Sequence, residues 1–185
     1  MERLLPSSTA LLVVDVQEKL AAAMPPDALA ELEKNAAILL EAAALLGVPV
    51  IVSEQYPKGL GPTVPSIAAR LASRGVVPIA KMCFDACSEL AISRALTLAG
   101  ARNVVVLGME THVCVFQTAR ELVKRGYTTY VVADAVASRR EENRRIGLSL
   151  CERAGAIVTT TESVAFDLLE HAGTGAFKAV SKLIR

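Results

Sequence analysis

The stretch Ala10–Val16, ALLVVDV, is a short apolar run that reaches a charged residue at Asp15 after only a few positions. Such a run predicts a first, buried β-strand. Asp27–Leu46 repeats apolar residues at three- and four-residue spacing, which predicts a helix with its acidic first residue as the N-cap and its end at Gly47. Val48–Ser53 follows as a second strand, so the chain opens as a β–α–β unit.

The same alternation of short apolar runs and helix-like segments continues along the chain. Further strands are predicted at Val77–Lys81, Asn103–Leu107, Tyr127–Ala133 and Ala156–Thr160, and further helices at Ser88–Ala99, Thr111–Arg125, Glu141–Ala154, Ser163–His171 and Ala176–Ile184. This order implies right-handed crossovers and a mostly parallel sheet covered by helices, the α/β class. Because no repeat, linker or low-complexity segment interrupts it, we expect a single domain over residues 1–185.

Composition and charge narrow the class of protein further. Hydrophobic residues make up 52% of the chain and aromatic residues only 4%, which suits a core of small branched side chains on a parallel sheet. The net charge is +1, so we expect no nucleic-acid partner. The N-terminus lacks a signal-peptide pattern, and the longest hydrophobic zone, Ala42–Val52, is too short for a membrane span. We therefore expect a cytoplasmic protein without membrane contact and with reduced cysteines.

Three residues whose side chains could take part in catalysis lie at or after the ends of predicted strands. Asp15 ends the first strand, Lys81 ends the third, and Cys114 lies six residues beyond Gly108, the last residue of the run VVVLG at the fourth strand. In a parallel sheet, ligands bind beyond the carboxyl ends of the strands, so these side chains can reach one site. A helix start and the Lys81 charge would favour the Cys114 thiolate, and Asp15 could accept and return a proton. Taken singly, each residue is better explained as a turn former, a solvated strand end or a buried apolar residue.

The sequence around these residues resembles the sequences of the isochorismatase-like cysteine hydrolases. The matching segments are LLVVDVQ around Asp15, PIAKMCFDA around Lys81, VVVLGMETHVCVFQTA around Cys114, SEQYPKGLGPTVP at Ser53–Pro65 and VVADAVASR at Val131–Arg139. Within that superfamily the chain looks most like the isochorismatase-domain-containing proteins of poorly defined substrate. The resemblance covers roughly residues 8 to 170.

The resemblance implies a three-layer α/β/α, Rossmann-like fold with a six-stranded parallel sheet in the order 3-2-1-4-5-6. It also implies a catalytic triad of Asp15, Lys81 and Cys114 and a cis peptide bond between Met109 and Glu110. The backbone N–H groups of Glu110 and Cys114 would then form the oxyanion hole. Relatives of the nicotinamidase type bind a metal through an Asp and two His after strand two, but the segment Glu54–Pro65 contains no histidine. We therefore expect no metal and no cofactor.

Several other groups of residues suggest alternative sites. Cys83, Cys87, His112 and Cys114 could be proposed as a zinc site, but the C-x-x-x-C spacing is loose and the metal would occupy the nucleophile. A redox pair of Cys83 and Cys87 lacks the usual two-residue spacing, and Cys151 is expected in the core. His112 could act as a base for the thiol, although a pocket wall or surface position is favoured. Arg139 and Arg140 could bind a substrate carboxylate, although a solvated loop is favoured.

The residues and the resemblance together predict a metal-independent hydrolase of a small amide or related acyl compound, which acts through a thioester on Cys114. The Pro- and Gly-rich segment Glu54–Pro65 is expected to be an irregular loop that contacts the substrate. Predicted pocket walls are Gln17, Tyr56, Phe84 and His112. The expected partners are a small-molecule substrate and further copies of the chain in a homo-oligomer. The alternatives are a non-catalytic binding or scaffold protein of the same fold and a thiol redox or metal-binding protein.

Overall fold

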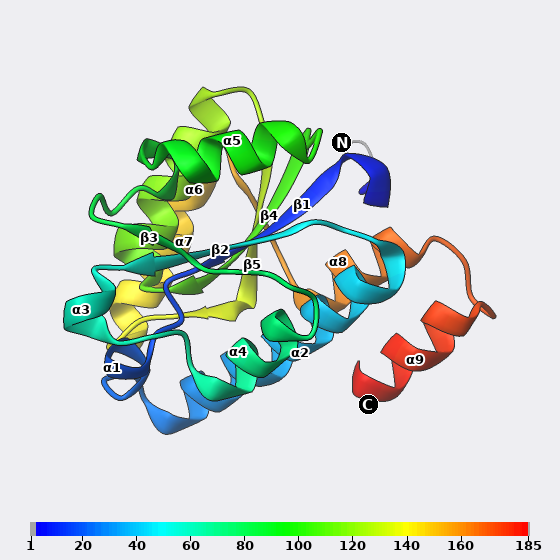
Figure 1. The fold of residues 1–185 in the computed structure, drawn as a ribbon, viewed down its shortest axis with the longest axis horizontal. Helices are drawn as coiled ribbons and strands as arrows, with labels where there is room; N and C mark the ends of the chain where they lie inside the picture. Colours follow the sequence, from blue (N-terminus) through cyan, green and yellow to red (C-terminus); the bar gives the residue numbers. More distant parts are fainter. Residues whose placement is uncertain (1–2, 185) are drawn as a thin grey trace.

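The computed structural model describes residues 3–184 (Figure 1). Its strands are β1 (Thr9–Val14), β2 (Val50–Gln55), β3 (Ile79–Lys81), β4 (Asn103–Met109), β5 (Thr128–Ala137) and β6 (Ile157–Thr159). Its helices are α1 (Glu18–Ala21), α2 (Pro26–Leu46), α3 (Pro57–Leu60), α4 (Pro65–Ala72), α5 (Leu90–Leu98), α6 (Phe116–Lys124), α7 (Glu141–Arg153), α8 (Thr161–Leu169) and α9 (Gly175–Ile184). Short 3-10 turns occupy Pro6–Ser8 and Ala86–Ser88, and a π-helical turn occupies Thr111–Val115.

The strands form one six-stranded sheet in the order β3-β2-β1-β4-β5-β6, and every pairing in it is parallel. Helices cover both faces, so the predicted three-layer α/β/α fold and strand order are confirmed (Figure 1). The chain leaves β1 for β2 on one side and reaches β4 on the other, so the direction of winding reverses between β1 and β4. Such a reversal point, at the carboxyl ends of the strands, is where ligands bind in open parallel sheets.

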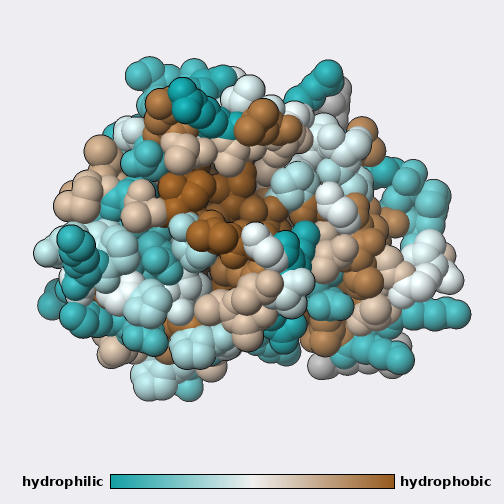
Figure 2. All heavy atoms as spheres, viewed as in Figure 1, coloured by the Kyte–Doolittle hydropathy of each residue, from teal (hydrophilic) through white to brown (hydrophobic). Residues whose placement is uncertain are grey.

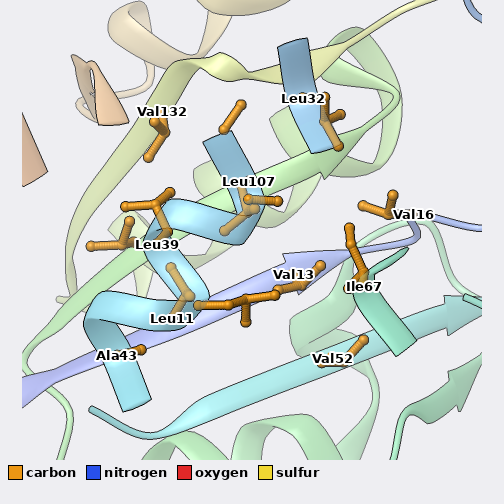
Figure 3. Close-up of a cluster of buried hydrophobic side chains, with 14 of the residues drawn as sticks. Leu11, Val13, Val16, Leu32, Leu39, Ala43, Val52, Ile67, Leu107 and Val132 are labelled. Carbon is orange, nitrogen blue, oxygen red and sulfur yellow. The ribbon is translucent and has the colours of Figure 1, made fainter. Parts of the chain in front are cut away.

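Alternate residues of β1 pack into two separate cores because successive side chains of a strand point to opposite faces. Leu11 and Val13 face the layer of α2, α4 and α8, where they pack in one cluster with Leu39 and Ile67 (Figure 3). The other face carries a second cluster with α5, α6 and α7, which includes Leu12, Val14, Ile92, Leu122 and Cys151. Burial on both faces explains why β1 reads as an uninterrupted apolar run rather than as an alternating one.

The first predicted helix is confirmed, but its start differs by one residue. Helix α2 begins at Pro26, and Asp27 lies inside the first turn rather than at the N-cap. Proline fits the first helical position because its fixed φ suits the helix and its missing N–H has no partner there. Asp27 still favours the helix, since a carboxylate near the N-terminus complements the helix dipole. The helix ends at Leu46, and its C-cap Gly47 has a φ of 70°.

The expectation of an irregular loop over Glu54–Pro65 is wrong in part. Strand β2 extends to Gln55, and Pro57 begins the one-turn helix α3. Tyr56 precedes that turn with a φ of 37°, and Gly59 lies so close to the Tyr56 ring that a Cβ there would be 2.2 Å from ring atom Cε1. Proline at the first position and glycine under the ring therefore form a compact turn from a segment whose composition suggested a loop.

Strand β5 is longer than predicted because it contains an irregular stretch. Its pairing with β4 shifts between Val106 and Gly108, and β5 resumes pairing at Val136 and Ala137. Within this stretch Asp134 accepts hydrogen bonds from the backbone N–H and the Oγ1 hydroxyl of Thr161, at the start of α8. A carboxylate inside the strand thus serves a neighbouring helix start, and its polarity explains why the predicted strand stopped at Ala133.

The surface seen in Figure 2 is hydrophobic at its centre, over β2 and β3 between α4 and α5. Large apolar side chains that are exposed include Val77 and Leu98, at 78% and 88%. An exposed apolar surface of this kind is typical of contact sites, and the predicted homo-oligomer stays a prediction. Across residues 3–184, no helix combines the length and the apolar character needed to cross a membrane.

Candidate functional site

Asp15, Lys81 and Cys114 lie together at the carboxyl edge of the sheet. Asp15 directly follows β1, Lys81 ends β3, and Cys114 lies in the π-helical turn after β4. Their exposed fractions are 0%, 2% and 5%, so all three are buried. Asp15 is hydrogen-bonded to Lys81 and lies close enough to Cys114 to raise the pKa of its thiol. The strand-end rule therefore located a cluster of buried polar side chains.

The Lys81 ammonium is completely enclosed by hydrogen-bond acceptors. Its Nζ atom donates to Asp15 Oδ2 at 2.6 Å and to Gln55 Oε1 at 2.7 Å. The backbone oxygens of Cys83 and Phe84 lie at 3.2 and 3.1 Å from the same atom. Neither Lys81 nor Asp15 has exposed side-chain area. The alternative of a solvated strand end is wrong for Lys81, since a buried charge of this kind requires such a set of partners.

Asp15 is held in position from both its backbone and its side chain. Its φ is 52°, in the left-handed region that aspartate tolerates better than most residues. Its N–H donates to the Ser53 carbonyl at 3.1 Å, and its Oδ1 accepts from Ser53 Oγ at 2.7 Å. One carboxylate oxygen is thus bonded to Ser53 and the other to Lys81. Both oxygens of the Asp15 side chain are therefore held in a fixed orientation.

The Cys114 thiol is neutral in this environment. Burial, as the larger cause, and the nearby Asp15 carboxylate raise the pKa of Cys114 to about 12, while Lys81 acts in the opposite direction. Lys81 thus favours the thiolate, as expected, but burial outweighs its effect and the thiol of the free protein keeps its proton. The physical reason is that Lys81 is paired with Asp15, so the thiol meets a neutralised pair in a site shielded from water.

The backbone around Cys114 is built by close approaches. The peptide bond between Met109 and Glu110 is cis, as the resemblance implied. Gly108 has a φ of 126°, and a Cβ there would lie 2.0 Å from the Val14 carbonyl oxygen of β1. Gly147 of α7 lies against the π-helical turn, where a Cβ would lie 2.7 Å from the backbone nitrogen of His112. Two glycines thus allow β1 and α7 to approach the turn that carries the thiol.

Two side chains, Glu110 and His112, tie this part of the chain to α7 and to the segment between β5 and α7. Glu110, which is 7% exposed, accepts at Oε1 from the Arg139 backbone N–H at 3.1 Å and from Arg139 Nε at 3.0 Å. His112 contacts Ser138 Oγ through Nδ1 at 3.1 Å and Asn143 Nδ2 through Nε2 at 3.4 Å. Both ring nitrogens are thus directed to these partners, which disfavours His112 as the base for the thiol.

The predicted pocket walls divide into two kinds. Tyr56 and Phe84 are 48% and 53% exposed, and both adjoin Lys81: the Tyr56 N–H donates to the Lys81 carbonyl, and the Phe84 carbonyl accepts from Nζ. Gln17 is fully buried, and its amide bonds to the backbone of Gln55 and to the Gly61 carbonyl. This placement favours a supporting role for Gln17, which joins β2 to the following turn, over direct contact with a substrate.

Some residues of the site were not among the predicted ones. These are Ser53, Gln55, Ser138, Asn143 and Gly147, all of which contact the proposed catalytic residues or the turn that carries Cys114. Ser53 and Gln55 stand at the carboxyl end of β2, so the strand-end rule could have found them. Ser138 directly follows β5, so the same rule applies to it. Asn143 and Gly147 depend on how α7 packs on the π-helical turn, for which the sequence has no local signal.

The cysteines proposed for a zinc site differ in environment. Cys83 is exposed, whereas Cys87 is buried and its pKa is raised to about 12, chiefly by burial. Cys151 is buried in the core, as expected. Within the described range 3–184, no group of three or more histidine, cysteine, aspartate or glutamate side chains is arranged to hold a metal ion.

Comparison with known proteins defines the class. The chain is an α/β/α protein with a buried Asp–Lys–Cys cluster at the reversal point of a parallel sheet, and its residues 9–163 match the isochorismatase domain. The chain therefore belongs to the isochorismatase family, which is a family of hydrolases.

Individual relatives agree with this assignment over nearly the whole chain. The isochorismatase domain-containing protein 2 of Bos taurus is 37% identical over 184 residues, which are 99% of this chain and 86% of that protein. A solved structure described as the MAR1 ribonuclease of Caenorhabditis elegans is 39% identical, with a TM-score of 0.87 over 99% of this chain and 92% of its own. The YcaC gene product of Escherichia coli, described as an octameric hydrolase of unknown specificity, shares the fold at 24% identity and a TM-score of 0.89, over 99% and 91% of the two chains.

Proposed function

We propose that this protein hydrolyses a small amide or related acyl compound through a covalent thioester on Cys114. The observation that carries the proposal is the buried Asp15–Lys81 pair, with Nζ and Oδ2 2.6 Å apart, next to a buried thiol. Burying two charges costs several kcal/mol, roughly, for each ion. A protein with no use for the pair gains little from it, so its position beside Cys114 supports a chemical role.

The raised pKa of Cys114 decides the order of the steps. Because the resting thiol is neutral, its proton passes to Asp15 as Sγ attacks the carbonyl carbon of the substrate. The backbone N–H groups of Glu110 and Cys114 stabilise the oxyanion. Asp15 then gives the proton to the leaving nitrogen or oxygen as the C–N or C–O bond breaks, and a thioester remains.

Water completes the cycle. Asp15 accepts a proton from a water molecule, the water oxygen attacks the thioester carbonyl, and the acid leaves as Sγ regains a proton. Lys81 keeps the Asp15 carboxylate oriented throughout, and its charge offsets the negative charge that develops on sulfur. Tyr56, Phe84 and His112 form the surroundings of the substrate. No metal or cofactor is required by this sequence of steps.

The direct test is turnover on an unbiased panel of amides, carbamoyl compounds and esters. Cys114→Ala should lower turnover of any confirmed substrate by at least about a thousandfold, because the residue forms the covalent intermediate. Cys151→Ala removes another buried thiol and is the matched control, which should retain activity. Mass spectrometry of the wild-type protein, quenched during turnover, should find the acyl group on Cys114. Full activity of Cys114→Ala would overturn the mechanism.

RNA should be tested as a substrate in the same panel, because a similar protein is described as a ribonuclease. The balance of 20 basic and 19 acidic residues does not favour a polyanionic substrate. Cleavage of RNA that survives in Cys114→Ala would assign that activity to another part of the protein or to a contaminant.

A further inference from the structure

A second cavity lies at the opposite end of the sheet from Asp15, Lys81 and Cys114. It has a volume of about 510 Å³, and its walls come from the segment before β1 and from the residues that precede and begin β4 and β5. In Figure 1 this end of the sheet lies beside the N-terminus. The three strands are parallel and run from the cavity toward the proposed active site, so the length of the sheet separates the two. A volume of this size falls in the range of small-molecule pockets.

Three arginines from distant parts of the chain line this cavity. They are Arg3, Arg102 and Arg125, and none of the lining residues in the described range is acidic. Backbone hydrogen bonds fix Arg102 between two of the walls. Its N–H donates to the Ser8 carbonyl at 2.8 Å, and its carbonyl accepts from the Thr128 N–H at 2.9 Å. The pairing of β1, β4 and β5 thus holds the three positive charges around one space.

The three arginines differ in how far their charges are already compensated. Arg3 forms an ion pair with Glu170, and Arg125 forms one with Glu121, in which Nε and Oε1 are 2.8 Å apart. Arg102 is exposed, and within residues 3–184 its guanidinium has no ion-pair partner. The cavity therefore holds one uncompensated cation beside two guanidinium groups that each have donors left over, since a single carboxylate cannot occupy all five N–H groups.

This arrangement suits a phosphate group better than a carboxylate. A phosphate monoester carries up to two negative charges and three strong acceptor oxygens, whereas a carboxylate carries one charge and two oxygens. Guanidinium groups that approach from three segments can each bond a different phosphate oxygen. The cavity is also larger than a phosphate ion needs. Leu5 and Tyr127 add apolar surface to its wall and Asn103 adds an amide, which suits the organic part of a phosphorylated compound.

We propose that this cavity is a second ligand site, which binds a small phosphorylated molecule through its phosphate group. Arg102 is the principal contact, because its charge has no partner in the described part of the chain. Arg3 and Arg125 bind the same group with the donors that their ion pairs leave over. The site lies at the far end of the sheet from Cys114, so the proposal goes beyond the proposed function and does not depend on the thioester mechanism.

The test is calorimetric titration at constant ionic strength. Ribose 5-phosphate and AMP are compared with ribose and adenosine, which lack the phosphate, and with succinate, a dicarboxylate. The two phosphate esters should bind and the other compounds should not. Arg102→Ala should weaken binding of the esters by roughly 10- to 100-fold, and Arg102→Lys by less, because lysine keeps the charge without the planar fork. Arg145→Ala, which removes an exposed arginine at the other end of the molecule, should bind like wild type. Circular dichroism checks that each variant is folded.

Each result decides for or against the phosphate site. Equal affinity for the two esters, or a higher affinity for AMP, supports it and identifies the source of the phosphate as general or as a nucleotide. Absence of binding, binding of succinate as tight as that of ribose 5-phosphate, or equal weakening by Arg102→Ala and Arg145→Ala would overturn it. Cys114→Ala should bind the esters like wild type, and a loss confined to that variant would place the anion at the thiol instead. Full catalytic activity of Cys114→Ala, in contrast, would overturn only the thioester mechanism.

Discussion

The two halves of the sheet contribute to the site in different ways. The half formed by β1, β2 and β3 supplies charge: Asp15 and Lys81 are paired and held by Ser53 and Gln55. The half formed by β4, β5 and α7 supplies the thiol, and it positions Cys114 by close backbone contact, with Gly147 pressed against His112. The charged half is held by hydrogen bonds around a buried ion pair, whereas the thiol half combines the hydrogen bonds of Glu110 and His112 with close backbone packing. The same site should therefore respond differently when each half is damaged.

Breaking the buried ion pair should give the largest loss of stability. Lys81→Met keeps most of the side-chain volume but leaves the Asp15 carboxylate buried without its cation, and we expect a loss of about 3–5 kcal/mol. Urea unfolding, followed by circular dichroism, measures the change. The double variant Asp15→Asn/Lys81→Met removes both charges and should recover much of the loss, although it should remain inactive. A Lys81→Met protein within about 1 kcal/mol of wild type would mean that the pair is not buried as described.

A substitution in the thiol half should cause a smaller loss of stability, and it should lower activity as well. Alanine normally stabilises a helix interior by about 1 kcal/mol over glycine. In Gly147→Ala, however, the added Cβ would lie 2.7–2.8 Å from backbone atoms of Thr111 and His112, which cannot move without moving the turn. We expect a net loss of about 1–3 kcal/mol together with slower turnover.

The matched control for that substitution is Gly175→Ala, in α9, where a Cβ would have no neighbour within 4 Å. It should leave stability unchanged or raise it by up to about 1 kcal/mol, with no change in kcat. If Gly147→Ala were stabilising in the same way, helix propensity would outweigh packing, and the close approach of α7 would not position Cys114.

The residues of the charged half and the fold could largely be predicted from the sequence. The apolar runs placed the strands, and the strand-end rule brought Asp15 and Lys81 to one edge, because both depend on local pattern and on general topology. The stretch around Asp134 was missed since its carboxylate serves a helix that is distant in sequence. The segment after Tyr56 was missed because its composition suggests a loop, while Pro57 begins a helical turn.

Fewer features of the thiol half could be predicted from the sequence. The position of Cys114 could be predicted, but the protonation state could not, because the effect of Lys81 depends on whether another group has already neutralised it. The role of Gly147 could not be predicted either, since an isolated glycine in a helix has no distinguishing signal until the partner surface is known. Local sequence pattern therefore located the proposed catalytic residues, whereas tertiary contacts determine the protonation of Cys114.

The smallest predicted effect compares Cys114 with Cys151, which lies in the core on α7. Burial raises the pKa of both thiols from 9.0 to about 12. Between about pH 9 and pH 12 the unfolded chain has lost these protons while the folded chain keeps them, so the free energy of unfolding falls as pH rises. Each thiol should contribute a fall of about 1.4 kcal/mol between about pH 8 and pH 10.

Cys114→Ala and Cys151→Ala should therefore flatten the pH dependence of unfolding by similar amounts, as measured by urea titration at each pH. Only Cys114→Ala should also abolish turnover, because only that thiol adjoins Asp15 and Lys81. A clearly smaller flattening in Cys114→Ala would show that Lys81 offsets more of the burial than its pairing with Asp15 suggests. In that case Lys81 in the charged half would favour ionisation of the Cys114 thiol, and the two halves could not be treated as separate contributions to the site.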